Sequence, residues 1–234
     1  MSDEIQSKSG LIIGASRGLG RGLSLELLKR GWDVTGTVRS VRGAGADAYE
    51  AYHGHVTMDT LDINNLSMID AFMCRLEGKI FDVIFIVAGV SAPEGKTVET
   101  VGSEDIAHLI MTNAVSPVRL AHRLLPNLRP ETGILAFMSS ILGSVDANTT
   151  GISSLYSASK AALNSLTRNF VAGMPRSDIT VLNMHPGWVR TDMGGASADI
   201  DVETSVSGIV DVLEAKAGTG GHHFLDYKGN TIPW

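Results

Sequence analysis

A tyrosine and a lysine four positions apart, Tyr156 and Lys160, are the residues of this chain best suited to acid–base chemistry. Residues at i and i+4 lie on one face of a helix, so the phenol and the ammonium can point into the same cavity. A free tyrosine titrates near pH ~10, and a neighbouring cation favours the phenolate, which moves the pKa toward neutrality. Ser140, upstream, offers a hydroxyl that could hold a substrate oxygen beside the phenol. This trio suits proton transfer at a carbonyl oxygen while hydride moves at the carbonyl carbon.

A glycine-rich turn near the N-terminus supplies the second half of such a reaction. The segment GASRGLG follows a predicted strand and opens a predicted helix, the setting in which a glycine loop holds phosphates. Glycine permits a sharp turn and close approach, while the helix N-terminus offers N–H donors. The spacing G-x-x-x-G-x-G differs from the common G-x-G-x-x-G, and a packing turn is the alternative. The predicted cofactor contacts here are Gly14, Ser16, Arg17, Gly18, Leu19 and Gly20.

Two arginines favour NADP(H) over NAD(H). An NAD site usually has an acidic residue about 20 positions after the glycine loop, for the ribose 2′-hydroxyl. Here the second predicted strand is followed by Arg39 and Ser40, and Arg17 lies inside the loop. Guanidinium groups suit a 2′-phosphate. The alternative is that both arginines are solvated surface charges.

The composition is that of a globular α/β protein with no gross electrostatic attraction for nucleic acid or an anionic membrane. The chain has 234 residues, 44% hydrophobic and 19% charged, and a formal net charge of −6. No signal peptide is evident and no apolar run reaches the ~18 residues of a membrane helix, which predicts a cytoplasmic protein. The lone Cys74 is expected to be a small buried hydrophobe. The histidines at 53, 55, 222 and 223 lack further ligands at a recognised spacing, so no metal site is predicted.

Strand-like and helix-like segments alternate along the chain, which favours a parallel sheet covered on both faces. We expect one domain over residues 1–234, a doubly wound Rossmann fold with about seven strands. The predicted strands that we can assign are 10–13, 33–38, 81–88, 133–138, 179–184 and 222–226. The predicted helices are 19–30, 66–77, one or two within 103–128 with an interruption near Pro117, 157–171 and 202–217.

These motifs together resemble the short-chain dehydrogenase/reductase family over essentially the whole chain. The matching segments are GASRGLG at 14–20, LDI at 61–63, VAG at 87–89, Asn113, SSILG at 139–143, YSASK at 156–160 and HPGWVRT at 185–191. The segments HPGWVRTDM and FLDYKGNTIPW look like the branch of C-factor-like proteins and Sniffer-type carbonyl reductases.

The resemblance implies a role for each matching residue. Tyr156 would be the general acid in reduction and the base in oxidation, and Lys160 would lower its pKa and bind the nicotinamide ribose. Ser140 rather than Ser139 would hold the substrate oxygen, because the family's serine precedes a glycine by three residues. Asn113 would support a proton relay. Further cofactor contacts would be Asp62 and Ile63 at the adenine, Ala88 and Gly89 at a ribose, and Pro186, Gly187, Val189 and Thr191 at the nicotinamide.

The sequence departs from the family pattern in several places. Ile13 stands where threonine is common before the glycine loop, and the family's Asn-Asn-Ala-Gly is Ile86-Val87-Ala88-Gly89, so this part of the sheet should be held differently. The segment 144–153 is longer than usual and should border the substrate mouth. The small, acidic segment 192–201 is expected to be a flexible substrate lid with a hinge at Gly194 and Gly195.

The expected activity is NADP(H)-dependent interconversion of a carbonyl compound and an alcohol, on a small-molecule substrate, by a homodimer or homotetramer. One alternative is an NADP(H)-binding sensor or signalling protein of the same fold with little turnover. Another is a sugar-nucleotide epimerase, for which the chain lacks a C-terminal sugar domain. Asn113 could also be a helix residue making a local backbone bond.

Overall fold

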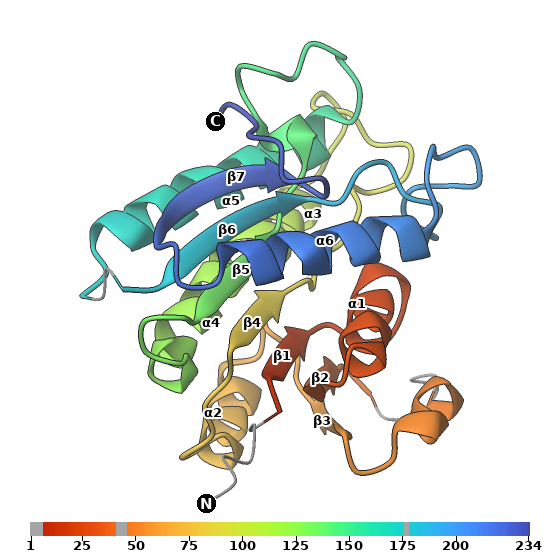
Figure 1. Cartoon of the computed structure of the whole chain (residues 1–234). Coiled ribbons are helices and arrows are strands. Elements are labelled where there is room, and N and C mark those ends of the chain that lie inside the picture. The colour runs from red at the N-terminus through yellow and green to blue at the C-terminus, as the bar shows by residue number, and fades with distance from the viewer. Residues whose placement is uncertain (1–6, 41–45, 176–177) are drawn as a thin grey trace, which may run out of the picture.

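A computed structural model of the chain describes residues 7–40, 46–175 and 178–234. Seven parallel strands form one sheet in the order β3-β2-β1-β4-β5-β6-β7 (Figure 1). This is the predicted doubly wound Rossmann sheet. The strands are β1 (Ser9–Ile13), β2 (Asp33–Val38), β3 (Val56–Thr60), β4 (Val83–Ile86), β5 (Ile134–Met138), β6 (Thr180–His185) and β7 (Gly221–Asp226).

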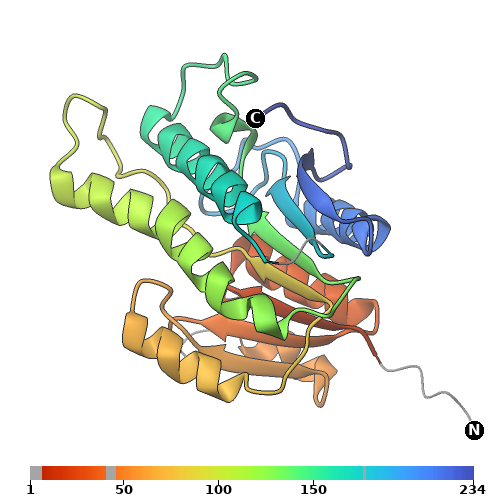
Figure 2. The same cartoon turned by 90° about the vertical axis from the view of Figure 1, so that its left-hand side faces the viewer.

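Two hydrophobic clusters lie on opposite faces of the sheet because successive residues of a strand point in opposite directions. In β1, Leu11 and Ile13 belong to one cluster and Ile12 to the other. The helices α2 (Leu66–Arg75), α4 (Ser116–Leu124) and α5 (Ser154–Ala172) pack on the first face. The helices α1 (Gly18–Lys29) and α6 (Val202–Lys216) cover the other, as the two views in Figures 1 and 2 show.

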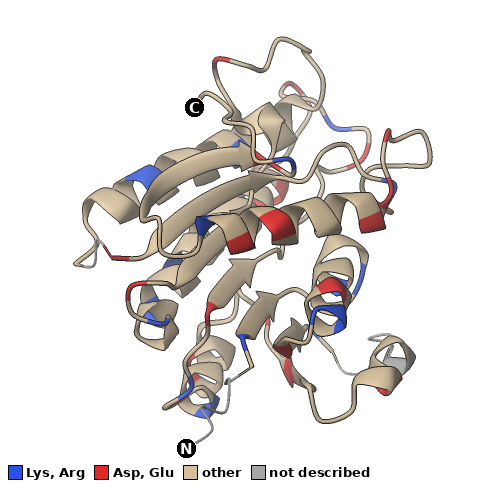
Figure 3. Ribbon diagram, viewed as in Figure 1, with Lys and Arg blue, Asp and Glu red and all other residues tan. Residues whose placement is uncertain are grey.

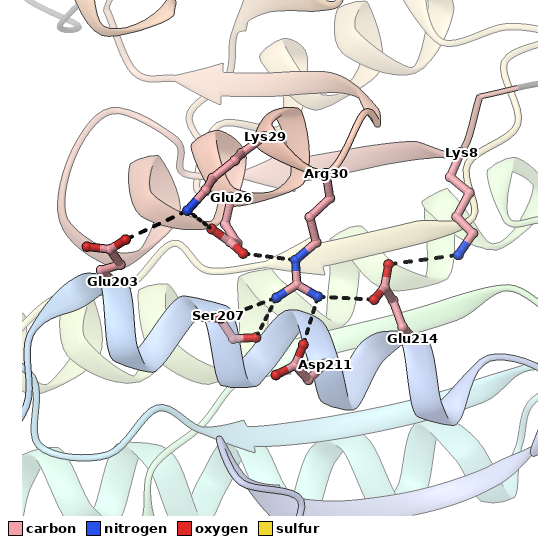
Figure 4. A network of polar contacts seen from close by, with 8 residues as sticks. All are labelled: Lys8, Glu26, Lys29, Arg30, Glu203, Ser207, Asp211 and Glu214. Carbon is pink, nitrogen blue, oxygen red and sulfur yellow. Dashed lines mark hydrogen bonds and ion pairs between the residues drawn. The ribbon is translucent and has the colours of Figure 1, made fainter.

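An ion-pair network joins α1 to α6 on the second face (Figure 4). The Arg30 guanidinium, just after α1, lies 2.8 Å from Glu26, 2.7 Å from Asp211 and 3.1 Å from Glu214. Hydrogen bonding and charge from Asp211 and Glu26 raise the pKa of Arg30 although burial opposes this. Elsewhere the face drawn in Figure 3 shows Lys and Arg dispersed among acidic residues.

Most predicted elements are present, with differences that have a local cause. The edge strand β3 was not predicted because its side chains are half-buried and give no continuous apolar run. The strand predicted over 81–88 is shorter, since β4 covers only Val83–Ile86. The helix predicted over 157–171 begins earlier, at Ser154, so that Tyr156 lies within it. The irregular helices Ala46–Tyr52, Leu125–Asn127 and Ile141–Gly143 complete the fold.

The segment 103–128 contains two helices and an interruption, as predicted. The helix α3 (Ser103–Ile110) leads into a π-helical turn, Met111–Val115, which leads directly into α4. Pro117 sits in the first turn of α4 and has no N–H to donate to the carbonyl of Asn113, four residues earlier. The π turn is therefore explained by a proline that removes one α-helical hydrogen bond.

The strand order reverses between β1 and β4, and a doubly wound sheet binds ligands at the carboxyl end of its strands at such a point. The glycine loop follows β1, and Ala88 and Gly89 follow β4. The segments after β4, β5 and β6 emerge at this same end (Figure 1). The fold thus brings the predicted site residues to one edge of the sheet.

Candidate active site

Tyr156 and Lys160 lie one turn apart on α5, as their spacing predicts. The Lys160 side chain is buried, its Nζ donates to the carbonyl of Met138 at 2.9 Å, and it lies 5.6 Å from the centre of the Tyr156 ring. The Tyr156 hydroxyl forms no hydrogen bond with any residue in the described ranges. It is therefore available to an external oxygen atom.

The pKa of Tyr156 moves in the direction opposite to the one expected. Burial raises the pKa of Tyr156 to about 12 and lowers the pKa of Lys160 to about 8. Desolvation disfavours the charged form of each group and is the cause of both shifts. The sequence identifies the cation but not the depth of burial. At neutral pH Tyr156 is thus a phenol that can donate its proton.

Ser139 and Ser140 have different roles in the turn after β5. The Ser139 hydroxyl is buried and donates to Asn164 Oδ1 at 2.7 Å. The Ser140 hydroxyl accepts a bond from the backbone N–H of Leu142 at 3.2 Å, which leaves its proton free to donate. Ser140 is thus the better placed of the two to bind a substrate oxygen, as expected.

Gly143 closes this turn against α5. A Cβ atom added at Gly143 would lie 2.7 Å from the backbone carbon of Lys160 and 2.8 Å from its Cβ. Only glycine fits in that space without a shift of either backbone. The turn that carries Ser140 therefore packs directly on the helix turn that carries Lys160.

Asn113 lies in the π-helical turn and is buried. Its Oδ1 accepts from the N–H of Val90 at 2.8 Å, and its Nδ2 donates to the carbonyl of Val90 at 2.9 Å and to Ser159 Oγ at 3.0 Å. These bonds reach distant segments, so the alternative of a local backbone bond is wrong. A Cβ added at Gly89 would lie 3.2 Å from Asn113 Oδ1 and 3.6 Å from Lys160 Nζ, which places Asn113 beside the lysine.

The glycine loop combines a packing role with an uncapped helix end. A Cβ at Gly14 would lie 2.9 Å from the amide nitrogen of Ala88, and one at Gly20 would lie 2.0 Å from the carbonyl of Gly14. Both positions need glycine for the turn itself. The first N–H groups of α1 receive no side-chain cap from Arg17, so they remain free to bind an anion. Packing and phosphate binding are therefore compatible in this loop.

The missing asparagines of the family pattern are replaced by backbone bonds and a threonine. The amides of Val87 and Ala88 both donate to the carbonyl of Ile13 at 2.9 Å. The amide of Gly14 donates to Thr37 Oγ1 at 3.0 Å. These bonds hold this part of the sheet without the asparagines of the family pattern.

The two arginines at the predicted ribose end are in different states. Arg39 follows β2, is exposed and pairs with no residue in the described part of the chain. Arg17 is also exposed but forms an ion pair of 2.7 Å with Asp192, in the segment after Thr191. Arg17 is thus not an unpaired surface charge, and any phosphate that uses it must compete with this carboxylate.

The remaining predicted cofactor residues follow β3, β4 and β6. Ser16 and Leu19 are half-buried in the glycine loop. The side chain of Ile63 is buried in the core, so only its backbone is open to a cofactor. Asp62 accepts from the amide of Asn64 at 2.9 Å. After β6, Pro186 and Val189 are buried, and Gly187 has φ +83°. Thr191 lies beside the glycine loop, since a Cβ added at Gly18 would be 3.7 Å from Thr191 Cγ2.

The expectation of a flexible segment at 192–201 is not matched by its contacts. Trp188 Nε1 donates to the carbonyl of Gly194 at 2.8 Å, and the amide of Gly194 donates to Thr191 Oγ1 at 3.1 Å. A Cβ at Gly194 would lie 2.0 Å from the carbonyl of Val189. Gly194 is therefore a packed turn residue rather than a free hinge.

The longer segment 144–153 exposes Val145 and Ile152, 82% and 59% accessible.

The histidines at 222 and 223 are accounted for by structural contacts, whereas the buried Nδ1 of His185 has no hydrogen-bond partner among the described residues. His222 Nε2 bonds to Asn183 Oδ1 at 3.0 Å and His223 Nε2 to the carbonyl of Gly220 at 3.0 Å. Burial lowers the pKa of His185 to about 4, so His185 is neutral. Cys74 is exposed, not buried as expected, because it lies on the outer side of α2.

Within residues 7–40, 46–175 and 178–234, no three His, Cys, Asp or Glu side chains gather closely enough to hold a metal. No helix in the described part of the chain is long and apolar enough to cross a membrane.

Two buried asparagines were missed. Asn164 on α5 and Asn183 on β6 are 4% and 0% exposed and bond to each other at 2.8 Å. An asparagine inside the apolar strand TVLNMH was the available signal, because a buried amide must find partners.

Comparison with known proteins identifies the family of the chain. The family model described as short chain dehydrogenase matches residues 8–200. A solved structure of a short-chain dehydrogenase/reductase from Burkholderia multivorans with bound NADP is 42% identical over 97% of this chain and all of that chain, with a TM-score of 0.93. The carbonyl reductase Sniffer of D. melanogaster is 32% identical over 98% of this chain and all of its own, with a TM-score of 0.86. The protein C-signal of Myxococcus xanthus is 40% identical over 134 residues, 56% of this chain and 79% of that protein.

Proposed function

The chain belongs to the short-chain dehydrogenase family, and from that membership we propose that it is an NADP(H)-dependent oxidoreductase that reduces a carbonyl group to an alcohol. The observation that carries the proposal is that the Tyr156 hydroxyl, which bonds to no described residue, lies one turn of α5 before the buried Lys160. The Ser140 turn packs against that helix turn through Gly143.

The proton in this reaction comes from Tyr156. Because its pKa lies about 12, the phenol is protonated at neutral pH and is ready to donate to a carbonyl oxygen. Ser140 holds that oxygen through its free hydroxyl proton, and Lys160 stabilises the phenolate that remains. Asn113 keeps Val90 and Ser159 in place beside the lysine.

The residues of the nucleotide end fit NADP(H), which supplies the hydride when bound. The uncapped N-terminus of α1 suits a pyrophosphate, and Arg39, which is exposed and pairs with none of the described residues, suits a 2′-phosphate. Arg17 can contribute if it leaves Asp192. The Burkholderia multivorans relative, which has bound NADP, supports the same choice. The preference over NAD(H) is part of the proposal.

The experiment is a fluorescence titration with NADPH and NADH, followed by NADPH consumption with a panel of aldehydes, ketones and quinones. We expect NADPH to bind more tightly than NADH. Tyr156→Phe should lower turnover about 100- to 10,000-fold without weakening NADPH binding. Tyr52→Phe, which removes a hydroxyl far from the site, should not change turnover. Failure to bind either nucleotide contradicts the proposal.

A second candidate is an NADP(H)-binding signalling protein with little turnover, favoured by the similarity to C-signal. NADPH binding without consumption across the panel would support it over the reductase. A homodimer or homotetramer remains a prediction, which sedimentation of the purified chain can test.

A further inference from the structure

A chain of hydrogen bonds, buried except at its partly buried β7 end, runs from β7 across β6 and α5 to the turn that carries Ser140. His222 Nε2 bonds to Asn183 Oδ1 at 3.0 Å. Asn183 Nδ2 donates to Asn164 Oδ1 at 2.8 Å and to Thr167 Oγ1 at 2.9 Å. We call Ser139, Asn164, Thr167, Asn183 and His222 the asparagine network.

Asn164 contacts the Ser140 turn on both of its sides. Its Oδ1 accepts from the Ser139 hydroxyl at 2.7 Å, and its Nδ2 donates to the carbonyl of Gly143 at 3.0 Å. Ser140 lies between these two anchoring points. A single buried amide thus fixes the start and the end of the segment whose hydroxyl is proposed to hold the substrate oxygen.

The hydrogen-bond partners of each asparagine in the network determine which way its side-chain amide is oriented. Asn183 Nδ2 faces two acceptors, so Asn183 Oδ1 must accept from His222, which carries its proton on Nε2. Burial lowers the pKa of His222 to about 4, so this neutral form persists at neutral pH. Trp234 covers His222, with ring centres 4.6 Å apart.

The network occupies a place where apolar residues would pack. Asn183 pairs in register with Phe137 of β5 and Phe224 of β7. Satisfied buried polar networks favour one arrangement of their members, because any displacement leaves a donor or acceptor unpaired. A reactive hydroxyl needs such a support, since a displacement of about 1 Å can cost about 100-fold in rate.

We propose that Asn164, oriented by Asn183, is a positioning residue for Ser140. The proposal rests on the proposed function only for the consequence in catalysis. Its structural part, that Asn164 holds the turn 139–143, stands apart from the reaction.

The first test is hydrogen exchange of the backbone amides in residues 139–148, measured by mass spectrometry on Asn164→Ala and on wild type. We expect at least a tenfold faster exchange at Gly143 and Ser144, which the turn protects through the carbonyls of Ser140 and Ile141. Asn127→Ala is the matched control. Asn127 is an equally buried asparagine that donates to the carbonyls of Leu76 and Lys79 far from the site, so exchange in 139–148 should not change.

The second test is a double-mutant cycle on kcat with a substrate that wild type reduces. Asn164→Ala should lower kcat about 10- to 100-fold with NADPH affinity within about twofold of wild type. In the Ser140→Ala background, Asn164→Ala should lower kcat by less than about threefold further, because each change removes the contact between the Ser140 hydroxyl and the substrate oxygen. If Asn164→Ala does not fold, Asn183→Ser replaces it in both tests.

The proposal would be overturned if the loss of kcat in the double variant equalled the product of the losses in Asn164→Ala and Ser140→Ala. Unchanged amide exchange at 139–148 in Asn164→Ala would also overturn it. Absence of any turnover by wild type would contradict the proposed function instead. The exchange experiment would then still decide whether Asn164 holds the turn.

Discussion

The Arg17 guanidinium lies 2.7 Å from the Asp192 carboxylate and joins the glycine loop to the segment after Thr191. Both side chains are exposed, 70% and 78% accessible, so the pair contributes little to stability. The pair matters because Asp192 competes with a cofactor phosphate for the Arg17 guanidinium. A phosphate would have to share that guanidinium with Asp192, so the ion pair opposes the binding of NADP(H).

Replacing Asp192 should strengthen NADPH binding. Asp192→Asn removes the competing charge at unchanged size, and the dissociation constant should fall about two- to fivefold, the range of an exposed ion pair. Asp199→Asn makes the same change of charge in the same segment, away from Arg17, and should have less effect. Fluorescence titration at low salt measures both. Equal effects of the two variants would mean that general charge, not the pair, is responsible.

Gly143→Ala should separate the Ser140 turn from α5. The added methyl would lie within 2.9 Å of three backbone or Cβ atoms of Lys160, and none of them is the end of a flexible side chain. We expect a loss of turnover of about 100-fold and a lower unfolding free energy, by about 1–3 kcal/mol. Gly102→Ala is the control, because its Cβ would meet only an atom 3.9 Å away. Turnover and urea denaturation of both variants check this.

Lys160→Met should stabilise the protein at pH 7 while abolishing turnover. With its folded pKa lowered to about 8, Lys160 is charged yet buried at pH 7. The folded state binds fewer protons than the unfolded chain between pH 8 and about 10.5, so wild-type stability rises through this window.

In Lys160→Met, the free-energy cost of burying the charged ammonium is absent, and so is the rise in stability between pH 8 and about 10.5. After loss of the bond to the Met138 carbonyl, we expect a gain of about 1–2 kcal/mol at pH 7. Urea denaturation at pH 7 and pH 9.5 measures this. A variant less stable than wild type at pH 7 would refute the assigned cost of burial.

Arg30→Met should loosen the contact between α1 and α6. Glu26 on α1 is only 9% accessible and would lose its main cationic partner, and Asp211 and Glu214, both on α6, would lose the cation that pairs with them. Because Arg30 is partly exposed, we expect a loss of about 1–3 kcal/mol, below that of a fully buried pair. Lys29→Met, next in sequence and 63% accessible, should change stability by about 0.5 kcal/mol or less. Similar losses in both variants would argue against a specific role of Arg30.

Most elements of the fold, and the residues of the candidate site, could be predicted from the sequence. Runs of apolar residues identified six of the strands, and the spacing of Tyr156 and Lys160 placed them on one helix face. Pro117 marked the interruption beside Asn113. These inferences succeed because periodicity, turn residues and helix spacing are local properties of the chain. The edge strand β3 was missed because its half-buried residues carry little local signal.

Only the tertiary structure decided how the side chains pair and how deeply they are buried. Arg17 meets Asp192, and Asn164 meets Ser139 and Asn183, across separations that no local pattern encodes. The pKa of Tyr156 rises rather than falls because distant segments bury and desolvate the phenol. Cys74 is exposed because the sheet packs against another side of α2. Burial and pairing depend on which segments the fold brings together, and that is a property of the whole chain.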